Sequence, residues 1–277
     1  MLRRDISTLF AAYQIAVLLV VLLVWSSSVG LAQTSSSLRV LSYNVHHCRG
    51  IDEKVDLPRI AKIITDCKPD LVALQEIDHQ ARRSGSVDQT AELARLTGMH
   101  GQFFKAIDFD GGGYGQAILS KTPLSDPQTV KLPNRAGREQ RIVGWATTEL
   151  YGKPVRFGTT HLDHADQAIR FEQAQQITSS FATASQPSII AGDFNASPES
   201  KELIELSKAI TFAKSERPTP SFPAERPTKQ IDYIGFATLQ PKSDLATQFR
   251  VVSFEVLDQP LASDHRPILA VLEFVAP

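Results

Sequence analysis

Short apolar runs bounded by turn-forming residues recur along the chain from residue 38 onward. Runs of this kind predict β-strands, over residues 38–45, 71–74, 117–120, 142–150, 155–160, 188–191, 231–236, 251–256 and 267–274. The run over 71–74 contains no polar residue, which is typical of a strand covered on both faces. The pattern therefore predicts β-sheet that lies inside the protein.

Apolar residues recur at helical spacing between some of these strands. Two segments carry this pattern: Leu57, Ile60, Ala61 and Ile64 in the first, and Ala168, Phe171, Ala174, Ile177 and Phe181 in the second. A third helix is expected over residues 198–210, with Pro198 in its first turn and Ser197 as its N-cap.

Two segments rich in turn-forming residues are expected to be loops. Residues 216–228 hold many prolines, which favours an extended surface loop. The run Gly111-Gly112-Gly113 suggests a phosphate cradle, but no Gly-Lys-Ser or Gly-Lys-Thr follows it, so a flexible loop is favoured. Because no internal repeat and no second linker interrupt the chain, we expect one folded domain.

The first 32 residues differ from the rest of the chain. Arg3 and Arg4 precede an apolar run over residues 9–25, and the small residues Gly30 and Ala32 fit the cleavage pattern of a signal peptidase. This arrangement favours a secretory signal peptide that is cut after Ala32. The apolar run is also long enough to just span a bilayer, so an uncleaved membrane anchor stays open.

Three parts are therefore expected along the chain. They are a signal peptide or anchor over residues 1–32, a polar linker over residues 33–37 and one domain over residues 38–277. With either form of leader the domain is exported, so we expect it to be secreted or periplasmic, or anchored outside the cytoplasm by residues 9–25.

Composition and charge narrow the choice of partners. Hydrophobic residues make up 42% of the chain and charged residues 21%, as in an ordinary soluble globular protein. Without residues 1–32 the chain has 27 basic and 29 acidic side chains. A net charge of −2 gives no general attraction for a polyanion, so tight non-specific nucleic-acid binding is not expected, although a nuclease is not excluded.

The chain contains only two cysteines, Cys48 and Cys67. Export would permit a disulfide between them, but two cysteines do not make a cysteine-stapled scaffold. Cys67 stands among apolar positions of a predicted helix, which favours a buried free thiol.

Polar residues with catalytic chemistry stand at the ends of several predicted strands. Four apolar strands run into such residues at their C-terminal ends: Asn44, Glu76, His161, and Asp193 with Asn195. Each of these has an ordinary explanation when taken alone, such as an Asx turn for Asp193 and Asn195. The combination is much harder to explain without a common site.

Two further polar groups stand at the N-terminal ends of predicted strands, namely Asp232 and the pair Asp264-His265. They can reach the same rim only if their strands run antiparallel to the others, so a mixed sheet or a pair of sheets is implied. Carboxylates beside apolar runs would cost several kcal/mol if they were dry and unpaired. A bound cation, or a rim open to water, removes that cost.

Seven segments together resemble the endonuclease/exonuclease/phosphatase family, which includes secreted deoxyribonucleases. They read Ser-Tyr-Asn-Val-His (42–46), Leu-Gln-Glu (74–76), Tyr-Gly-Gln-Ala-Ile-Leu-Ser (114–120), Thr-His-Leu-Asp (160–163), Gly-Asp-Phe-Asn (192–195), Gln-Ile-Asp-Tyr-Ile (230–234) and Ser-Asp-His-Arg-Pro (263–267). They occur in the family's order and span nearly all of residues 38–275. The resemblance implies an α/β fold, a four-layer α/β/β/α sandwich of two mixed β-sheets with outer helices, and a catalytic role for the domain.

The resemblance also implies roles for individual residues. Glu76 would bind a divalent cation with the help of Asn44 and Asp264, and oxygen ligands of this kind suit Mg²⁺ or Mn²⁺. Asp193 would orient or deprotonate the attacking water, and Asn195 would hold that water or the phosphate.

The remaining implied roles concern the scissile phosphate. His265, paired with Asp232, and His161 would contact it, and Arg141 is a looser match for another positive contact. The family often has Asn at the position of Gln116, and its small secreted members often have Gly at the position of Cys48. Either departure could reshape the pocket, but neither removes a required donor.

The leading hypothesis is therefore an exported, metal-dependent phosphodiesterase or nuclease that acts as a monomer without a protein partner. A phospholipid head-group phosphodiesterase and a phosphomonoesterase stay open on the same fold. A lipid substrate would favour exposed aromatic residues, for which Phe109, Tyr114 and Phe222 are candidates.

Two alternatives of other classes find less support in the sequence. Residues 161–164 (His-Leu-Asp-His) look like half of a zinc hydrolase site, but Thr159 stands where that site needs a histidine. A non-catalytic surface-binding module would have been indicated by the loss of Glu76, Asp193 or His265, and all three are present.

Overall fold

The computed structural model describes residues 37–184, 186–237 and 248–275. The described residues all belong to one compact unit, Ser36–Pro277. The expected signal peptide or anchor, residues 1–32, lies outside the described residues, as does all of the expected linker except Ser37, which begins the first strand. No helix in the described part of the chain is both long and apolar enough to cross a membrane.

In the described residues, twelve strands form two six-stranded mixed sheets. The order in the first sheet is β11 (Gln248–Val256), β12 (Ile268–Val275), β1 (Ser37–Asn44), β2 (Leu71–His79), β4 (Gly112–Ser120) and β3 (His100–Phe109). The order in the second sheet is β5 (Leu124–Lys131), β6 (Ile142–Leu150), β7 (Lys153–His161), β8 (Ser188–Asp193), β10 (Asp232–Ala237) and β9 (Ile210–Phe212). Each sheet has one parallel pair near its centre, β1 with β2 and β7 with β8, and its other pairs are antiparallel.

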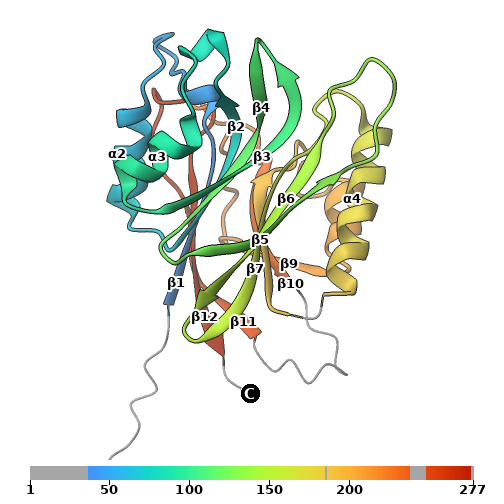
Figure 1. Cartoon of the computed structure of the whole chain (residues 1–277). Coiled ribbons are helices and arrows are strands. Elements are labelled where there is room, and N and C mark those ends of the chain that lie inside the picture. The colour runs from blue at the N-terminus through green and yellow to red at the C-terminus, as the bar shows by residue number, and fades with distance from the viewer. Residues whose placement is uncertain (1–36, 185, 238–247, 276–277) are drawn as a thin grey trace, which may run out of the picture. The chain divides into compact units, whose positions relative to one another are not determined.

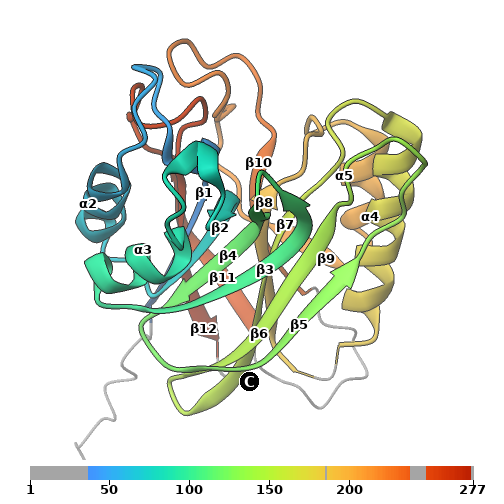
Figure 2. The same ribbon diagram turned by 45° about the horizontal axis from the view of Figure 1, so that its top comes forward.

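Four α-helices cover the outer faces of the two sheets (Figures 1 and 2). Helices α2 (Leu57–Cys67) and α3 (Gln89–Thr97) pack on the first sheet, and α4 (Gln167–Ala182) and α5 (Lys201–Leu206) pack on the second. Two short 3₁₀ helices, η1 (His46–Cys48) and η2 (Arg82–Ser84), complete the described helical elements. The expected four-layer α/β/β/α sandwich is confirmed.

Both faces of the central strands are apolar because both are covered. In β1, Leu38 and Val40 face the other sheet, whereas Leu41 and Tyr43 face the helices. The layer between the sheets joins residues of both, such as Phe104 from β3. Its continuity fixes the position of one sheet against the other.

Side-chain caps explain where the three longer helices begin. Asp56, Asp88 and Asp166 each accept a hydrogen bond from a backbone N–H in the first turn of α2, α3 and α4. Ser200 does the same for α5 by accepting from the N–H of Leu203 at 3.3 Å. The expected cap at Ser197 and the expected helix over 198–210 are therefore wrong, because α5 is shorter and residues 210–212 form β9.

The structure contains four elements for which the sequence pattern gave no signal, namely α3, β3, β5 and β9. Strands β3 and β5 are edge strands, and most of their residues are at least partly exposed, so their sequences lack a continuous apolar run. Helix α3 buries only Leu93 among its apolar residues. The glycine run was expected to be a loop, but Gly112 and Gly113 lie in β4 and only Gly111, with φ +84°, serves the turn.

The cysteines are both free thiols in the described structure. Cys48 is fully buried in the apolar layer between the first sheet and its helices. Cys67 is only partly buried, so the expected burial of its thiol is incomplete.

Replacing Phe104 with Ala tests the layer between the sheets. Phe104 is 1% exposed, and its ring approaches the backbone of Gly144 on the opposite sheet, so truncation leaves a cavity. We expect the free energy of unfolding to fall by about 3–5 kcal/mol in urea denaturation. Ile204, on α5, is 61% exposed, and Ile204→Ala should change stability by less than about 0.5 kcal/mol; equal effects would contradict this packing.

Candidate active site

One rim of the sandwich gathers the polar residues that end or begin the central strands. Asn44 and His161 are the last residues of β1 and β7, and Asp193 is the last residue of β8. Asp232 is the first residue of β10, which runs antiparallel to β8. The antiparallel arrangement inferred from the polar positions is thus confirmed for β10 against β8 and for β12 against β1.

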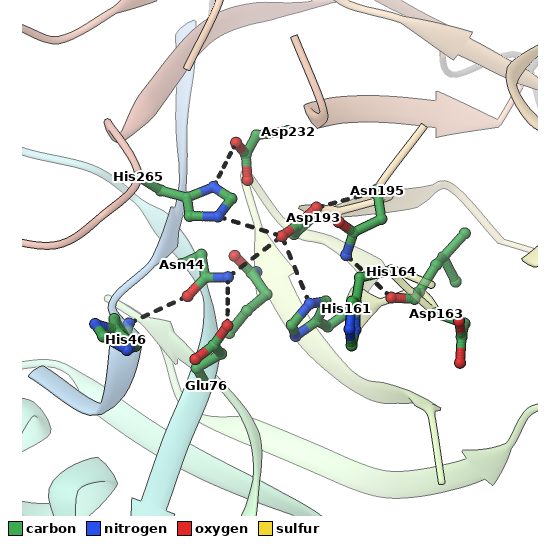
Figure 3. A network of polar contacts seen from close by, with 12 residues as sticks. Asn44, His46, Glu76, His161, Asp163, His164, Asp193, Asn195, Asp232 and His265 are labelled. Atoms are coloured by element: carbon green, nitrogen blue, oxygen red, sulfur yellow. Dashed lines mark hydrogen bonds and ion pairs between the residues drawn. The ribbon is translucent and has the colours of Figure 1, made fainter. Parts of the chain in front are cut away.

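Strand register places three of these residues side by side. Asp193 lies opposite His161 on one neighbouring strand and opposite Asp232 on the other. Figure 3 shows their side chains pointing toward one another, with His265 between the two aspartates. The juxtaposition is therefore a consequence of sheet pairing rather than of loop conformation.

Glu76 reaches this group because β2 contains a bulge. The pairing of β2 with β4 shifts register between Gln75 and Ile77, and Glu76 has φ +60°. A bulge re-aims the side chain of the extra residue. Gln75 meanwhile points between the sheets and donates to Thr159 Oγ1 at 3.0 Å.

Asn44 links the carboxylates of the two sheets. Its Nδ2 donates to Glu76 Oε1 at 3.0 Å and to Asp193 Oδ2 at 3.3 Å. Its Oδ1 accepts from the backbone N–H of His46 at 3.1 Å, which fixes the orientation of the amide. Glu76 and Asp193 are therefore held on either side of a single side chain (Figure 3).

His265 lies between two almost fully buried aspartates. Its Nδ1 is 2.9 Å from Asp232 Oδ2, and its Nε2 is 3.6 Å from Asp193 Oδ2. Ser221 Oγ also donates to Asp232 Oδ2 at 2.5 Å. Burial disfavours the charged imidazole, but Asp232 and Asp193 outweigh it and raise the pKa of His265. We infer that His265 is an imidazolium at neutral pH.

At Asp193, burial has the largest effect on the pKa and is not outweighed by the neighbouring charges. Burial, and then the charge of Asp232, raise the pKa of the Asp193 carboxyl, while His265 and the hydrogen bonds from Asn195 and Asn44 act in the opposite direction. A carboxylate with a raised pKa is a stronger base than an exposed one. Asp193 is therefore well suited to accept a proton.

His161 forms the other flank of Asp193. Its Nε2 is 3.5 Å from Asp193 Oδ2. Burial, followed by the charges of Arg141 and His265, lowers the pKa of His161 well below its ordinary value. The site thus pairs a neutral histidine with a cationic one, and each can act as a hydrogen-bond donor.

Two other residues predicted from the sequence, Asn195 and Asp264, lie around this centre. Asn195, with φ +47°, donates its backbone N–H to Asp193 Oδ1 at 2.9 Å and its Nδ2 to the Leu162 carbonyl at 3.1 Å. Asp264 adjoins β1 because Ser263 Oγ is 2.7 Å from the Asn44 carbonyl and 3.3 Å from Asp264 Oδ1.

Arg141 is buried beside Glu139 and His164 rather than against Asp193. It lies 3.0 Å from a Glu139 oxygen and 3.3 Å from Nδ1 of His164. Its Nε has no hydrogen-bond partner among the described residues. The guanidinium therefore retains a donor for an anionic group.

Two groups of side chains could hold a metal ion in the described structure. One contains His46, His47 and Glu76, and the other contains Asp193, Asp232 and His265. In the second group both nitrogens of His265 already face carboxylate oxygens, so the imidazolium itself neutralises them. The first group leaves the Glu76 carboxylate available to a cation.

The zinc arrangement that residues 161–164 resemble in the sequence does not form. Asp163 Oδ1 accepts the backbone N–H groups of Ala165 and Asp166 at 2.8 and 2.6 Å, and His164 is exposed. Neither of the two groups of side chains that could hold a metal ion in the described residues includes His161, Asp163 or His164. The structure therefore does not support the hypothesis of a zinc site at residues 161–164.

The loop over residues 216–228 contributes more to the site than its prolines suggested. Ser221 is fully buried against Asp232, and the Phe222 ring lies 4.7 Å from the His265 ring between centroids. The centre of the loop is thus not an extended surface segment. Turn-forming residues indicated the loop, but nothing in the local sequence indicated which side chain it would bury.

Gln116 was noted only as a departure from the family, yet it positions His161. With the amide oriented to satisfy both neighbours, its nitrogen donates to the Thr159 carbonyl at 3.0 Å and its oxygen accepts the His161 N–H at 3.1 Å. It therefore ties β4 of the first sheet to β7 of the second, next to the site.

The model of the endonuclease/exonuclease/phosphatase family matches residues 41–265. The chain belongs to this family. Family members are generally phosphoesterases, and the group around Asp193 occupies the rim at which the matched motifs meet. No curated protein matches the chain.

Solved structures with the same fold include other family members. An endonuclease/exonuclease/phosphatase from Beutenbergia cavernae is 26% identical with a TM-score of 0.70, over 86% of this chain and 72% of that chain. A mannosyl-6-phosphatase from Bacteroides thetaiotaomicron is 20% identical with a TM-score of 0.67, over 85% and 99%. The human Nocturnin catalytic domain, with a bound sulfate anion, is 21% identical with a TM-score of 0.66, over 87% and 94%.

Replacing Gln116 with Leu tests how His161 is positioned in this family member. The change leaves the His161 N–H and the Thr159 carbonyl without their side-chain partner, so we expect a loss of about 1–3 kcal/mol in the free energy of unfolding. Gln175→Leu, at an exposed position of α4, is the matched control and should have little effect. Comparable unfolding midpoints for the two variants in urea would contradict the role of Gln116.

Proposed function

We propose that the protein is an exported, divalent-metal-dependent phosphodiesterase that uses a carboxylate-activated water. The observation that carries the proposal is a series of contacts from Glu76 through Asn44 to Asp193 and from Asp193 to His265. These contacts bring the Glu76 carboxylate, the proposed base Asp193 and the cationic His265 together at one rim. The leader-like pattern of residues 1–32 supports export.

Asp193 is proposed to orient the attacking water and to take its proton. Its carboxylate is fixed by Asn44 through Oδ2 and by the Asn195 N–H through Oδ1, so it cannot rotate away from the site. Its raised pKa makes proton transfer from water easier than it would be for an exposed aspartate. Asn195, close to Asp193 and half-buried, would steady the water or the phosphate.

The histidines and Arg141 are proposed to receive the phosphate. His265 carries a positive charge and would stabilise negative charge that develops on the phosphate oxygens, with Asp232 holding its ring. His161, as a neutral imidazole, would donate a hydrogen bond without repelling Arg141. The unpartnered Nε of Arg141 offers a further donor.

The residues present fit a divalent cation at Glu76. Its carboxylate would hold the ion, and the family resemblance adds Asn44 and Asp264 as oxygen donors, which suit a hard divalent ion such as Mg²⁺ or Mn²⁺. When bound, such an ion neutralises a phosphate oxygen and contributes several kcal/mol to stabilising the transition state.

The substrate is proposed to be a phosphodiester, which includes nucleic acid, because the sequence motifs resemble those of the family. A net charge of −2 for residues 33–277 argues against strong non-specific attraction for a long polyanion. The lipid alternative loses its main support, because Tyr114 is buried, Phe109 lies under the Arg83 guanidinium and Phe222 packs on His265. No protein partner is proposed, and we propose a monomer.

A phosphomonoester is the second candidate. It is favoured by the likeness to the mannosyl-6-phosphatase, which extends over 99% of that chain. A monoester would place its extra negative charge near His265 and Arg141, and its leaving group would be a sugar rather than a nucleotide.

A substrate panel separates these candidates. The full chain would be assayed against plasmid DNA, RNA, sphingomyelin, a chromogenic phosphodiester and mannose 6-phosphate, each with and without a chelator. We expect hydrolysis of a diester to fall by about 10² or more after chelation, because the cation contributes several kcal/mol, and to return when Mn²⁺ or Mg²⁺ is added. Diester hydrolysis that persists at full rate in metal-free protein would contradict the metal dependence.

Asp193→Asn tests the proposed base. The amide keeps the shape of the carboxylate but cannot take a proton, so we expect kcat to fall by about 10²–10⁴ while the circular dichroism spectrum stays unchanged. Asp258→Asn, at an exposed aspartate paired with Arg266, is the control and should retain wild-type activity. A folded Asp193→Asn protein with normal kcat would remove Asp193 from the mechanism.

A further inference from the structure

Two consecutive histidines lie beside the Glu76 carboxylate. One ring nitrogen of His46, one of His47 and one oxygen of Glu76 all lie within 4.8 Å of one another. Ligand atoms around a single first-row ion are about 2.0–2.2 Å from it and therefore up to roughly 4.4 Å apart. Small side-chain rotations would bring the three groups onto one ion.

The backbone that presents these rings is strained. His46, His47 and Cys48 have φ values of +46°, +46° and +61°, and three such residues without a glycine are uncommon in L-amino-acid chains. Strain of this kind persists only where the surroundings enforce it. Here Gln89, which is fully buried, donates to the His47 carbonyl at 2.8 Å, and the Cys48 N–H donates to the Val45 carbonyl at 2.8 Å.

His47 also has a nitrogen without a partner. Its side chain is almost completely buried, with the residue 5% exposed, and its Nδ1 makes no hydrogen bond within the described structure. A buried imidazole nitrogen without a partner is unfavourable unless a ligand occupies it.

The orientation of Asn44 strengthens the case for nitrogen ligands. Its amide nitrogen faces Glu76, and its oxygen already accepts the His46 N–H. Asn44 therefore positions Glu76 and the turn that carries the histidines, as Figure 3 shows for His46 and Glu76 on either side of it. The two imidazoles are the side chains that lie close enough to the Glu76 carboxylate to share one ion with it in the described structure.

We propose that His46 and His47 are ligands, together with Glu76, of the divalent cation in this site, and that the site prefers a first-row transition ion over Mg²⁺. This inference rests on the proposed function, because it concerns the cation assigned there to Glu76. Imidazole nitrogen binds transition ions well and Mg²⁺ poorly, whereas an all-oxygen site suits Mg²⁺. The mixed set of two nitrogens and one carboxylate would thus reverse the preference expected from the oxygen donors alone.

Metal binding to chelator-treated full chain tests the proposal, with Co²⁺ and Mg²⁺ as probes. We expect Co²⁺ to bind at least about 10²-fold more tightly than Mg²⁺ in titration calorimetry. In the proton NMR spectrum of the Co²⁺ protein, two exchangeable imidazole N–H signals should be shifted far outside the ordinary range. This measurement on the wild-type protein needs no variant to fold.

Variants then assign the ligands. His46→Gln and His47→Gln should each remove one shifted signal and weaken Co²⁺ binding by about 10–100-fold, with Mg²⁺ binding changed less than about threefold. Glu76→Gln should weaken the binding of both ions. His100→Gln, at an exposed position of β3, is the matched control and should bind Co²⁺ as the wild type does.

The outcomes separate this inference from the proposed function. Co²⁺ binding that depends on Glu76 but shows no shifted imidazole signals would overturn the histidine ligands and leave the proposed metal role of Glu76 intact. Binding of both ions that is insensitive to Glu76→Gln would overturn the proposed metal site itself, and with it the assignment of His46 and His47.

Discussion

Two buried aspartates that share one imidazolium are the constraint on which the rest of the site depends. Sheet pairing forces Asp193 and Asp232 next to each other on β8 and β10, in a place from which water is largely excluded. Without a cation between them, at least one would have to be protonated. His265 supplies that cation, and by doing so it draws the segment before β12 and the loop around Ser221 onto the end of the second sheet.

Five of the twelve non-glycine residues with positive φ in the described structure lie at the same rim. Glu76, Asn195 and the turn from His46 to Cys48 all adopt left-handed conformations without glycine, while the apolar strands that lead to them pair in regular register. At this rim, regular strands therefore end in backbone conformations that turn their side chains toward a common centre. Such departures are expected at functional sites rather than in the core.

The family resemblance implied the layered fold, and the apolar runs that end in polar residues predicted which side chains would meet at one rim. Asp193 and Asp232 illustrate this, since the antiparallel direction of β10 could be inferred from which end of the strand carried the carboxylate. What could not be predicted were interactions without a periodic signature. Gln116 reaches from one sheet to the other, Phe222 packs on a histidine 43 positions away, and the bulge at Glu76 leaves no mark in the local pattern of apolar residues.

The pairing of β12 with β1 joins the final described strand to the first one, so the first sheet is complete only when residues 268–275 are in place. Asp264 and His265 arrive with this closing segment, and until then Asp193 and Asp232 have no imidazolium between them. A chain that lacks this segment therefore carries the proposed base without its cationic partner. All strands of the second sheet precede His265 in the sequence, so the charge of its two aspartates is balanced only by a segment that belongs to the other sheet.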